Sequence, residues 1–119
     1  MREALFFLTD LLSPFSERCP DTEVAEDQDW QLVTYLSGCY LVTPSLAHQL
    51  ARCDLTKRVP DQVAAELRQI AHNVTLRNQQ FQSQLAEIVT DFDADARSYA
   101  VLKGGAYRVQ PVYPTPYMR

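Results

Sequence analysis

Apolar side chains recur every three or four residues along a long run of sequence that begins after Pro60. The members of this apolar seam are Val63, Leu67, Ile70, Val74, Phe81, Leu85, Ile88 and Phe92, with one polar position at Arg77 or Asn78. Such spacing places the side chains on one face of an α-helix and predicts a single helix over about residues 60–95. We expect it to be the central helix of a helical layer, because the shorter helices before it leave apolar faces that need a partner.

Two further helices are predicted near the N-terminus and the middle of the chain. Residues 3–12 place Leu5, Leu8 and Leu12 at helical spacing and end at Ser13-Pro14, and an exposed connection follows as far as about residue 27. A second helix is expected over about residues 27–40, with acidic residues near its positive N-terminal end.

A third short helix should begin at Thr43 and Pro44, which supply an N-cap and a first-turn proline. The composition agrees with a mainly helical fold, since the 119 residues include only 3 glycines for tight turns. The fold class that we predict is α+β and predominantly α.

No segment of the sequence is apolar enough to cross a membrane. The longest stretch without a charged residue, Trp30 to Ala51, contains several polar side chains, and the apolar run Ala4 to Leu8 is too short for a secretory signal. We therefore expect a cytoplasmic protein that does not bind membranes.

The composition changes near residue 97. Residues 96–119 carry four cations and no carboxylate, together with four tyrosines and three prolines. Ser98 to Leu102 is predicted to be a single strand bounded by Gly104-Gly105. Because nothing else in the chain offers a convincing second strand, we expect a homodimer or a partner that supplies a strand, or else a poorly ordered segment. The expected organisation is a helical region over 1–97 and a partial strand-turn with a Pro/Tyr-rich tail over 98–119.

The three cysteines, Cys19, Cys39 and Cys53, form no C-x-x-C pattern, so we expect reduced, structural thiols. A zinc site that combines them with His48 is disfavoured, because the spacings lack the close ligand pairs of structural zinc sites. His48 and His72 are the only histidines, and neither lies in a known nucleophile motif.

Two other charged segments are weak candidates for a functional site. Asp91, Asp93 and Asp95 form two overlapping D-x-D patterns, but they lie at a predicted helix end, where a solvated, fraying turn is the simpler interpretation. The basic, tyrosine-rich tail could stack on single-stranded nucleic acid. Its few cations, in a chain of net charge −4, make nucleic-acid binding an unfavoured interpretation.

The tract from Val101 through Lys103 to Gly104-Gly105 combines a strand end with two glycines, which would let a backbone approach a phosphate. In order along the chain stand Asp29-Trp30, Val59-Pro60, Arg77-Asn78, this tract, Tyr113-Pro114 and Arg119. This order resembles an uncharacterised bacterial nucleotidyltransferase family over about residues 29–119. The resemblance implies a helical region followed by the start of a nucleotidyltransferase-like αβ unit.

The resemblance also implies a set of nucleotide-binding residues. They are Lys103, Gly104, Gly105, Arg119 and, on the long helix, Arg77. A nucleoside triphosphate and Mg²⁺ are implied as ligands of the family. The alternative for Arg77 is that its side chain simply reaches water at the edge of the helix.

The chain departs from the family pattern at its end, because it stops at Arg119, where the acidic D-x-D strand is expected. We therefore expect no catalytic residue and no metal or cofactor for this chain alone, whether it is a natural truncation or part of a longer protein. The leading hypothesis is the N-terminal part of a nucleotidyl-transferring enzyme. The alternative is a non-enzymatic helical module that uses the apolar seam to bind a partner or itself.

The 119-residue chain on its own should transfer no nucleotidyl group, because no carboxylate follows Asp95 to hold the magnesium ions that this chemistry requires. A transfer assay with labelled nucleoside triphosphates, in the presence of Mg²⁺ or Mn²⁺, tests this expectation. Metal-dependent transfer that disappears in a folded Gly105→Trp variant would contradict it.

Overall fold

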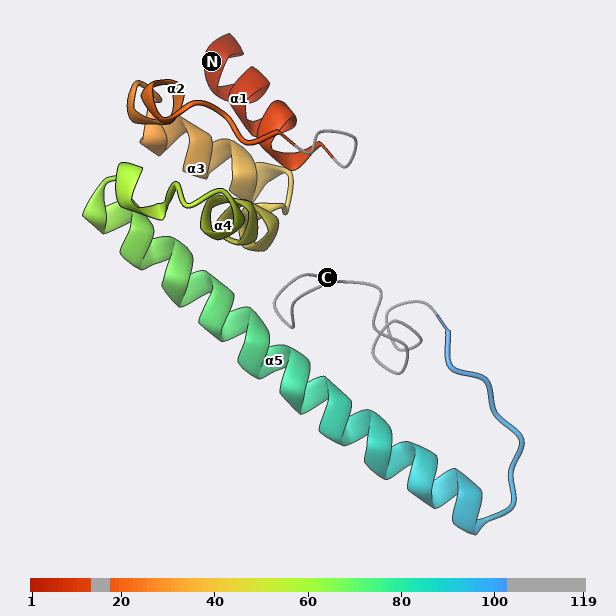
Figure 1. Ribbon diagram of the computed structural model, residues 1–119. Helices are drawn as coiled ribbons and strands as arrows, with labels where there is room; N and C mark the ends of the chain where they lie inside the picture. Colours follow the sequence, from red (N-terminus) through yellow and green to blue (C-terminus); the bar gives the residue numbers. More distant parts are fainter. Residues whose placement is uncertain (14–17, 103–119) are drawn as a thin grey trace. The chain divides into compact units, whose positions relative to one another are not determined.

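The computed structural model describes residues 1–13 and 18–102, and the described part is helical (Figure 1). The elements in chain order are α1 (Arg2–Leu12), α2 (Thr22–Glu26), α3 (Trp30–Cys39), α4 (Thr43–Arg52), the 3-10 helix η1 (Thr56–Arg58) and α5 (Asp61–Ala94). The prediction of a predominantly α fold is confirmed. The chain divides into two compact units, Met1–His72 and Asn73–Arg119.

The first unit has its core where α1, α3 and α4 pack on one another. Its centre includes Trp30, which is 4% exposed and lies edge-on to Phe7 with ring centroids 5.7 Å apart. The side chains of Val33 on α3 and Leu46 on α4 are fully buried beside other apolar residues. Burial of these side chains is the main source of stability in a unit of this size.

The predicted face of the first helix is partly wrong. Helix α1 buries Ala4, Phe7, Leu8 and Leu11, whereas Leu5 is 37% exposed. Leu8 is buried and Leu12 packs against the core, as the leucine spacing predicts, but the buried face of the helix is rotated away from Leu5. Ala4 and Phe7 decide the orientation because they share a face with Leu8 and Leu11.

Helix α3 begins later than expected, at Trp30, because Asp29 caps it. The Asp29 carboxylate accepts a hydrogen bond from the backbone N–H of Leu32 at 3.1 Å. A side-chain oxygen at this position pairs one of the amides that a helix N-terminus leaves without a partner. The predicted acidic N-terminal end of this helix is therefore confirmed at Asp29.

Thr43 does not have the predicted role of an N-cap for the third helix. The cap residue of α4 is Val42, and no side chain caps the helix. The Thr43 hydroxyl lies 3.0 Å from the hydroxyl of Ser37, and the two form a buried hydrogen bond between α3 and α4. A buried hydroxyl requires such a partner, and this contact holds the two helices across the short turn that joins them.

Residues 13–27 are not the wholly exposed connection that their polar composition predicts. Helix α2 lies within this segment and buries Ala25 completely. The Ala25 carbonyl accepts a hydrogen bond of 3.0 Å from the Trp30 indole N–H, and Glu26 pairs with Arg58 of η1 at 2.7 Å. Because α2 has only five residues, these tertiary contacts rather than local propensity stabilise it.

The expectation of reduced thiols is wrong for two of the cysteines. Cys19 and Cys53 form a disulfide, with Cα atoms 5.5 Å apart and a sequence separation of 34, while Cys39 is free and exposed. The bond joins the segment before α2 to the C-terminal end of α4. Neither the spacing of the cysteines nor a local motif predicts this disulfide, because only the fold brings the two residues together. A cross-link that closes a loop of this length stabilises a fold by about 2–4 kcal/mol.

The long helix is confirmed as α5, which starts directly after Pro60 and runs to Ala94. The apolar seam of α5 is covered only in part, which differs from the central helix of a helical layer that we expected. Ala64 and Leu67 belong to the core of the first unit, whereas Phe81 is 59% exposed and Ile88 is 51% exposed. Helical periodicity shows which residues share a face, but it does not show how far another element covers that face.

Helix α5 ends in a turn built on Ala96, which has a φ of 53°. The N–H of Arg97 donates to the carbonyl of Phe92 at 2.9 Å, and the N–H of Ala96 donates to that of Asp93 at 3.1 Å. This pairing satisfies carbonyls that the helix end would otherwise leave open. An alanine occupies the left-handed position that usually holds glycine.

The predicted strand at Ser98 to Leu102 is not formed in the described part of the chain. A strand needs a neighbour to pair its backbone groups, and residues 1–13 and 18–102 contain no second strand. The remaining strand-turn unit, residues 103–119, lies outside the described residues. Within those that are described, no helix has the length and apolar character needed to cross a membrane.

Replacing a buried leucine and an exposed leucine of the first unit should give very different results. Leu46→Ala should cost about 2–5 kcal/mol of unfolding free energy, because Leu46 is fully buried and the truncation leaves a cavity. Leu41→Ala is the matched control, since Leu41 is 62% exposed, and its cost should stay within about 0.5 kcal/mol. Urea unfolding followed by circular dichroism measures both. Equal losses would mean that Leu46 does not lie in the core.

Candidate functional site

Of the nucleotide-binding residues implied by the sequence, the structure describes only Arg77. It lies on α5 with an exposed side chain. Lys103, Gly104, Gly105 and Arg119 lie outside the described residues, so their placement relative to Arg77 remains a prediction.

Arg77 and its neighbour Asn78 occupy opposite environments on α5. Asn78 is 4% exposed and has an interaction partner, whereas Arg77 faces solvent. Asn78 therefore takes the polar position of the apolar seam, between Val74 and Phe81 at helical spacing. The sequence left open which of the two residues interrupts the seam, and the structure identifies Asn78. The Arg77 guanidinium is left available to an anionic ligand.

The aspartates at the end of α5 make local contacts. Asp95 pairs with Arg97 at 3.1 Å, and both side chains are more than half exposed. The pKa of Tyr99 is raised, because partial burial disfavours the phenolate and, secondarily, because its hydroxyl hydrogen-bonds to Asp93. Its ring also packs against Phe92 with centroids 5.8 Å apart. Through these contacts the chain folds back on the end of α5. The carboxylates of Asp93 and Asp95, which a D-x-D metal site would need, are engaged with Tyr99 and Arg97.

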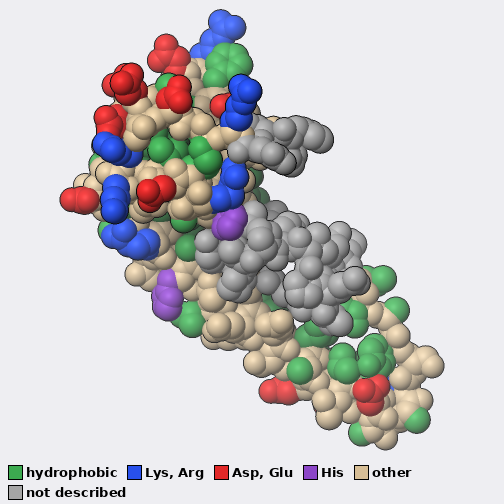
Figure 2. All heavy atoms as spheres, in the orientation of Figure 1, with side chains coloured by type: hydrophobic (Ala, Val, Ile, Leu, Met, Phe, Trp, Pro, Cys, Tyr) green, Lys and Arg blue, Asp and Glu red, His purple; other side chains and the backbone are tan. Residues whose placement is uncertain are grey.

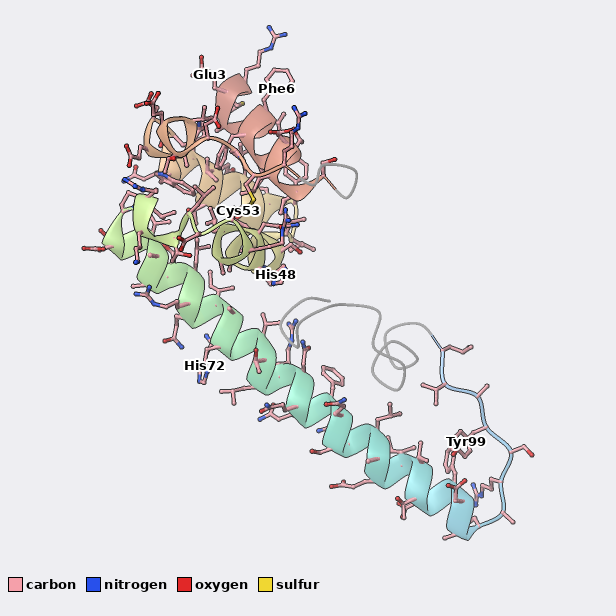
Figure 3. All side chains as sticks on the ribbon, in the orientation of Figure 1. Glu3, Phe6, His48, Cys53, His72 and Tyr99 are labelled. Carbon is pink, nitrogen blue, oxygen red and sulfur yellow. A yellow bond between two sulfur atoms is a disulfide. The ribbon has the colours of Figure 1, made fainter. Side chains whose placement is uncertain are left out.

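Within the described residues, no group of three or more His, Cys, Asp or Glu side chains is arranged to hold a metal ion. The thiols of Cys19 and Cys53 are bonded to each other. His48 is half-buried on α4 and His72 is exposed on α5 (Figure 3). The donor set of the described residues does not fit the magnesium ions that nucleotidyl transfer uses, and we derive no catalytic step through a metal.

A groove of about 710 Å³ lies between α3 and the first turns of α5. Its lining residues are Gln31, Thr34, Tyr35, Gly38 and Cys39 from α3 and Gln62, Val63 and Glu66 from α5. The Thr34 hydroxyl is buried without a hydrogen-bond partner among the described residues, and a side chain added at Gly38 would meet open space. Sequence reasoning missed this groove, although the polar residues of α3 recur at helical spacing.

The reactive groups of this groove are a phenol and a thiol. Tyr35 and Cys39 lie one turn apart on α3, and Cys39 raises the pKa of the Tyr35 phenol, first by a hydrogen bond and then by charge. Neither group has a basic partner in the groove, so the groove offers hydrogen bonding without an activated nucleophile.

Comparison with known proteins places the chain in a family. Residues 26–119 match the family described as uncharacterised nucleotidyltransferase. The match covers most of the chain, from the end of α2 through α3, α4 and α5, and the chain belongs to this family. No curated protein and no solved structure shows a significant match.

Proposed function

We propose that the chain forms the N-terminal part of a nucleotidyl-transferring enzyme and contributes to the binding of a nucleoside triphosphate. The observation that carries this proposal is the family match, which includes the Lys103-Gly104-Gly105 tract. Glycines permit a close approach of backbone N–H groups to phosphate oxygens, and a neighbouring lysine neutralises their charge.

Arg77 has a suitable chemistry for the same ligand. Its guanidinium is exposed on α5, and a guanidinium can donate two parallel hydrogen bonds to one phosphate. Helix α5 is an uninterrupted segment of 34 residues, so it would present Arg77 from a rigid backbone. In this proposal Arg77 binds and orients the triphosphate, and Lys103 and Arg119 add positive charge.

Substitution of the proposed phosphate contacts should weaken triphosphate binding by the full chain. Lys103→Ala and Arg77→Ala should each raise the dissociation constant about tenfold, the effect of losing one charge-assisted hydrogen bond. Titration calorimetry with each ribonucleoside triphosphate and magnesium measures the change.

The matched controls are Lys57→Ala and Arg68→Ala, which remove the same charges at exposed positions on η1 and α5. Both controls should bind within about twofold of the unaltered chain, because they test net charge alone. Equal losses in the variants and their controls, or no binding of any triphosphate by the full chain, would contradict the proposal.

The alternative is a helical module that associates with a second copy of itself. The favouring observation is the exposure of apolar seam residues beyond His72, where Phe81, Ile88 and Phe92 are 59%, 51% and 36% exposed. Sedimentation velocity, which measures the oligomeric state, separates the two functions. A dimer that is lost in the Ile88→Glu variant but retained in the Lys103→Ala variant would support self-association. A monomer at all concentrations would exclude it.

A further inference from the structure

A second groove, of about 730 Å³, lies within the first unit between α1 and the segment that carries α2. Residues from both sides line it, among them Glu3, Phe6, Asp10, Val24 and Asp27. It lies apart from Arg77 in the chain and belongs to no part of the proposed nucleotide site. Glu3 and Phe6 both lie towards the N-terminal end of α1 (Figure 3).

The charged side chains that line this groove are all acidic, although the Arg2 guanidinium lies over Phe6 at its edge. Glu3, Asp10 and Asp27 line it, and none of the three pairs with a basic residue in the part of the chain that the structure describes. Acidic side chains gather over α1 and α2 on the face seen in Figure 2, with Lys and Arg side chains beside them. The last turn of α1 contains no basic residue, so the negative end of its dipole adds to the charge of Asp10.

The groove also presents apolar surface to solvent. Phe6 is 60% exposed and Val24 is 47% exposed, and both line the groove. The guanidinium of Arg2 already sits over the Phe6 ring, 5.5 Å from its centroid. The Phe6 ring therefore already accepts a guanidinium, and an arginine of a bound peptide that takes the place of Arg2 would make the same cation–π contact.

We propose that this groove docks a cationic peptide segment that carries an apolar side chain between its arginines or lysines. The carboxylates pair with the cations, and the apolar side chain covers Phe6 and Val24. An anionic ligand, such as a nucleic acid or an acidic membrane surface, would be repelled. A bare polyamine would leave the apolar surface uncovered. This inference is independent of the proposed nucleotidyltransferase function.

The test uses the full chain and a fluorescein-labelled heptapeptide with three arginines and one central leucine. Fluorescence anisotropy should show binding that weakens as salt is raised, because exposed ion pairs are screened. The same peptide with citrulline in place of arginine should bind at least tenfold more weakly. Replacing its leucine with glycine should also reduce binding, by about threefold or more.

Protein variants separate this groove from net charge. Asp10→Asn with Asp27→Asn should weaken peptide binding at least tenfold, whereas Glu87→Gln with Asp91→Asn, which removes the same charge from α5, should leave it within about twofold. Phe6→Ser should weaken binding while circular dichroism stays unchanged, because the Phe6 side chain is largely exposed.

Three results would overturn the proposal. Equal losses of peptide affinity in the two double variants would show that binding depends only on the overall charge of the chain. Equal binding of the citrulline peptide would remove the role of the carboxylates. Spermine that displaces the peptide at the same concentration as the unlabelled peptide would show that the groove is a small-cation site.

Discussion

The first unit depends on the burial of one side chain, the indole of Trp30. This residue begins α3, packs edge-on against Phe7 of α1, and donates its indole N–H to the carbonyl of Ala25 in α2. One buried ring thus joins α3, to which it belongs, to the two helices before it. Because an indole N–H that loses its partner in a core costs about 1–3 kcal/mol, α2 must stay in place for the ring to remain buried.

Other contacts of α2 follow from this arrangement. Ala25 is buried because α2 must approach α3 closely enough to accept the indole hydrogen bond. Once α2 is in place, Glu26 reaches Arg58 of η1. This ion pair joins α2 to the segment that leads into α5, although a half-exposed pair adds little stability of its own. The disulfide from Cys19 to Cys53 then fixes the segment before α2 to the end of α4.

The sequence predicts the features of the fold that depend on local periodicity and capping. Helix α5 and the Asp29 cap of α3 are examples, since both depend on residues close together in the chain. Helix α2 and the disulfide could not be predicted in this way, because tertiary contacts create them. The strand prediction at residues 98–102 failed for a related reason, since local composition cannot supply a pairing neighbour.

The same distinction applies to the candidate sites. The family was recognised from a few motifs in order along the chain, and the family match confirms it. Only the structure shows that Arg77, rather than Asn78, faces solvent, because both residues fit the spacing of the seam. Neither groove was predicted, since each is lined by residues from two segments that only the fold brings together.

Native-state hydrogen exchange of the Trp30 indole N–H tests the central claim most directly, namely that the first unit is organised around this buried ring. The account predicts that the indole N–H and the backbone amides of Val33 and Leu46 exchange with the same opening free energy, because all three are released only when the unit unfolds. An indole N–H that exchanges much faster than both amides would show that α2 opens independently, and would contradict the account.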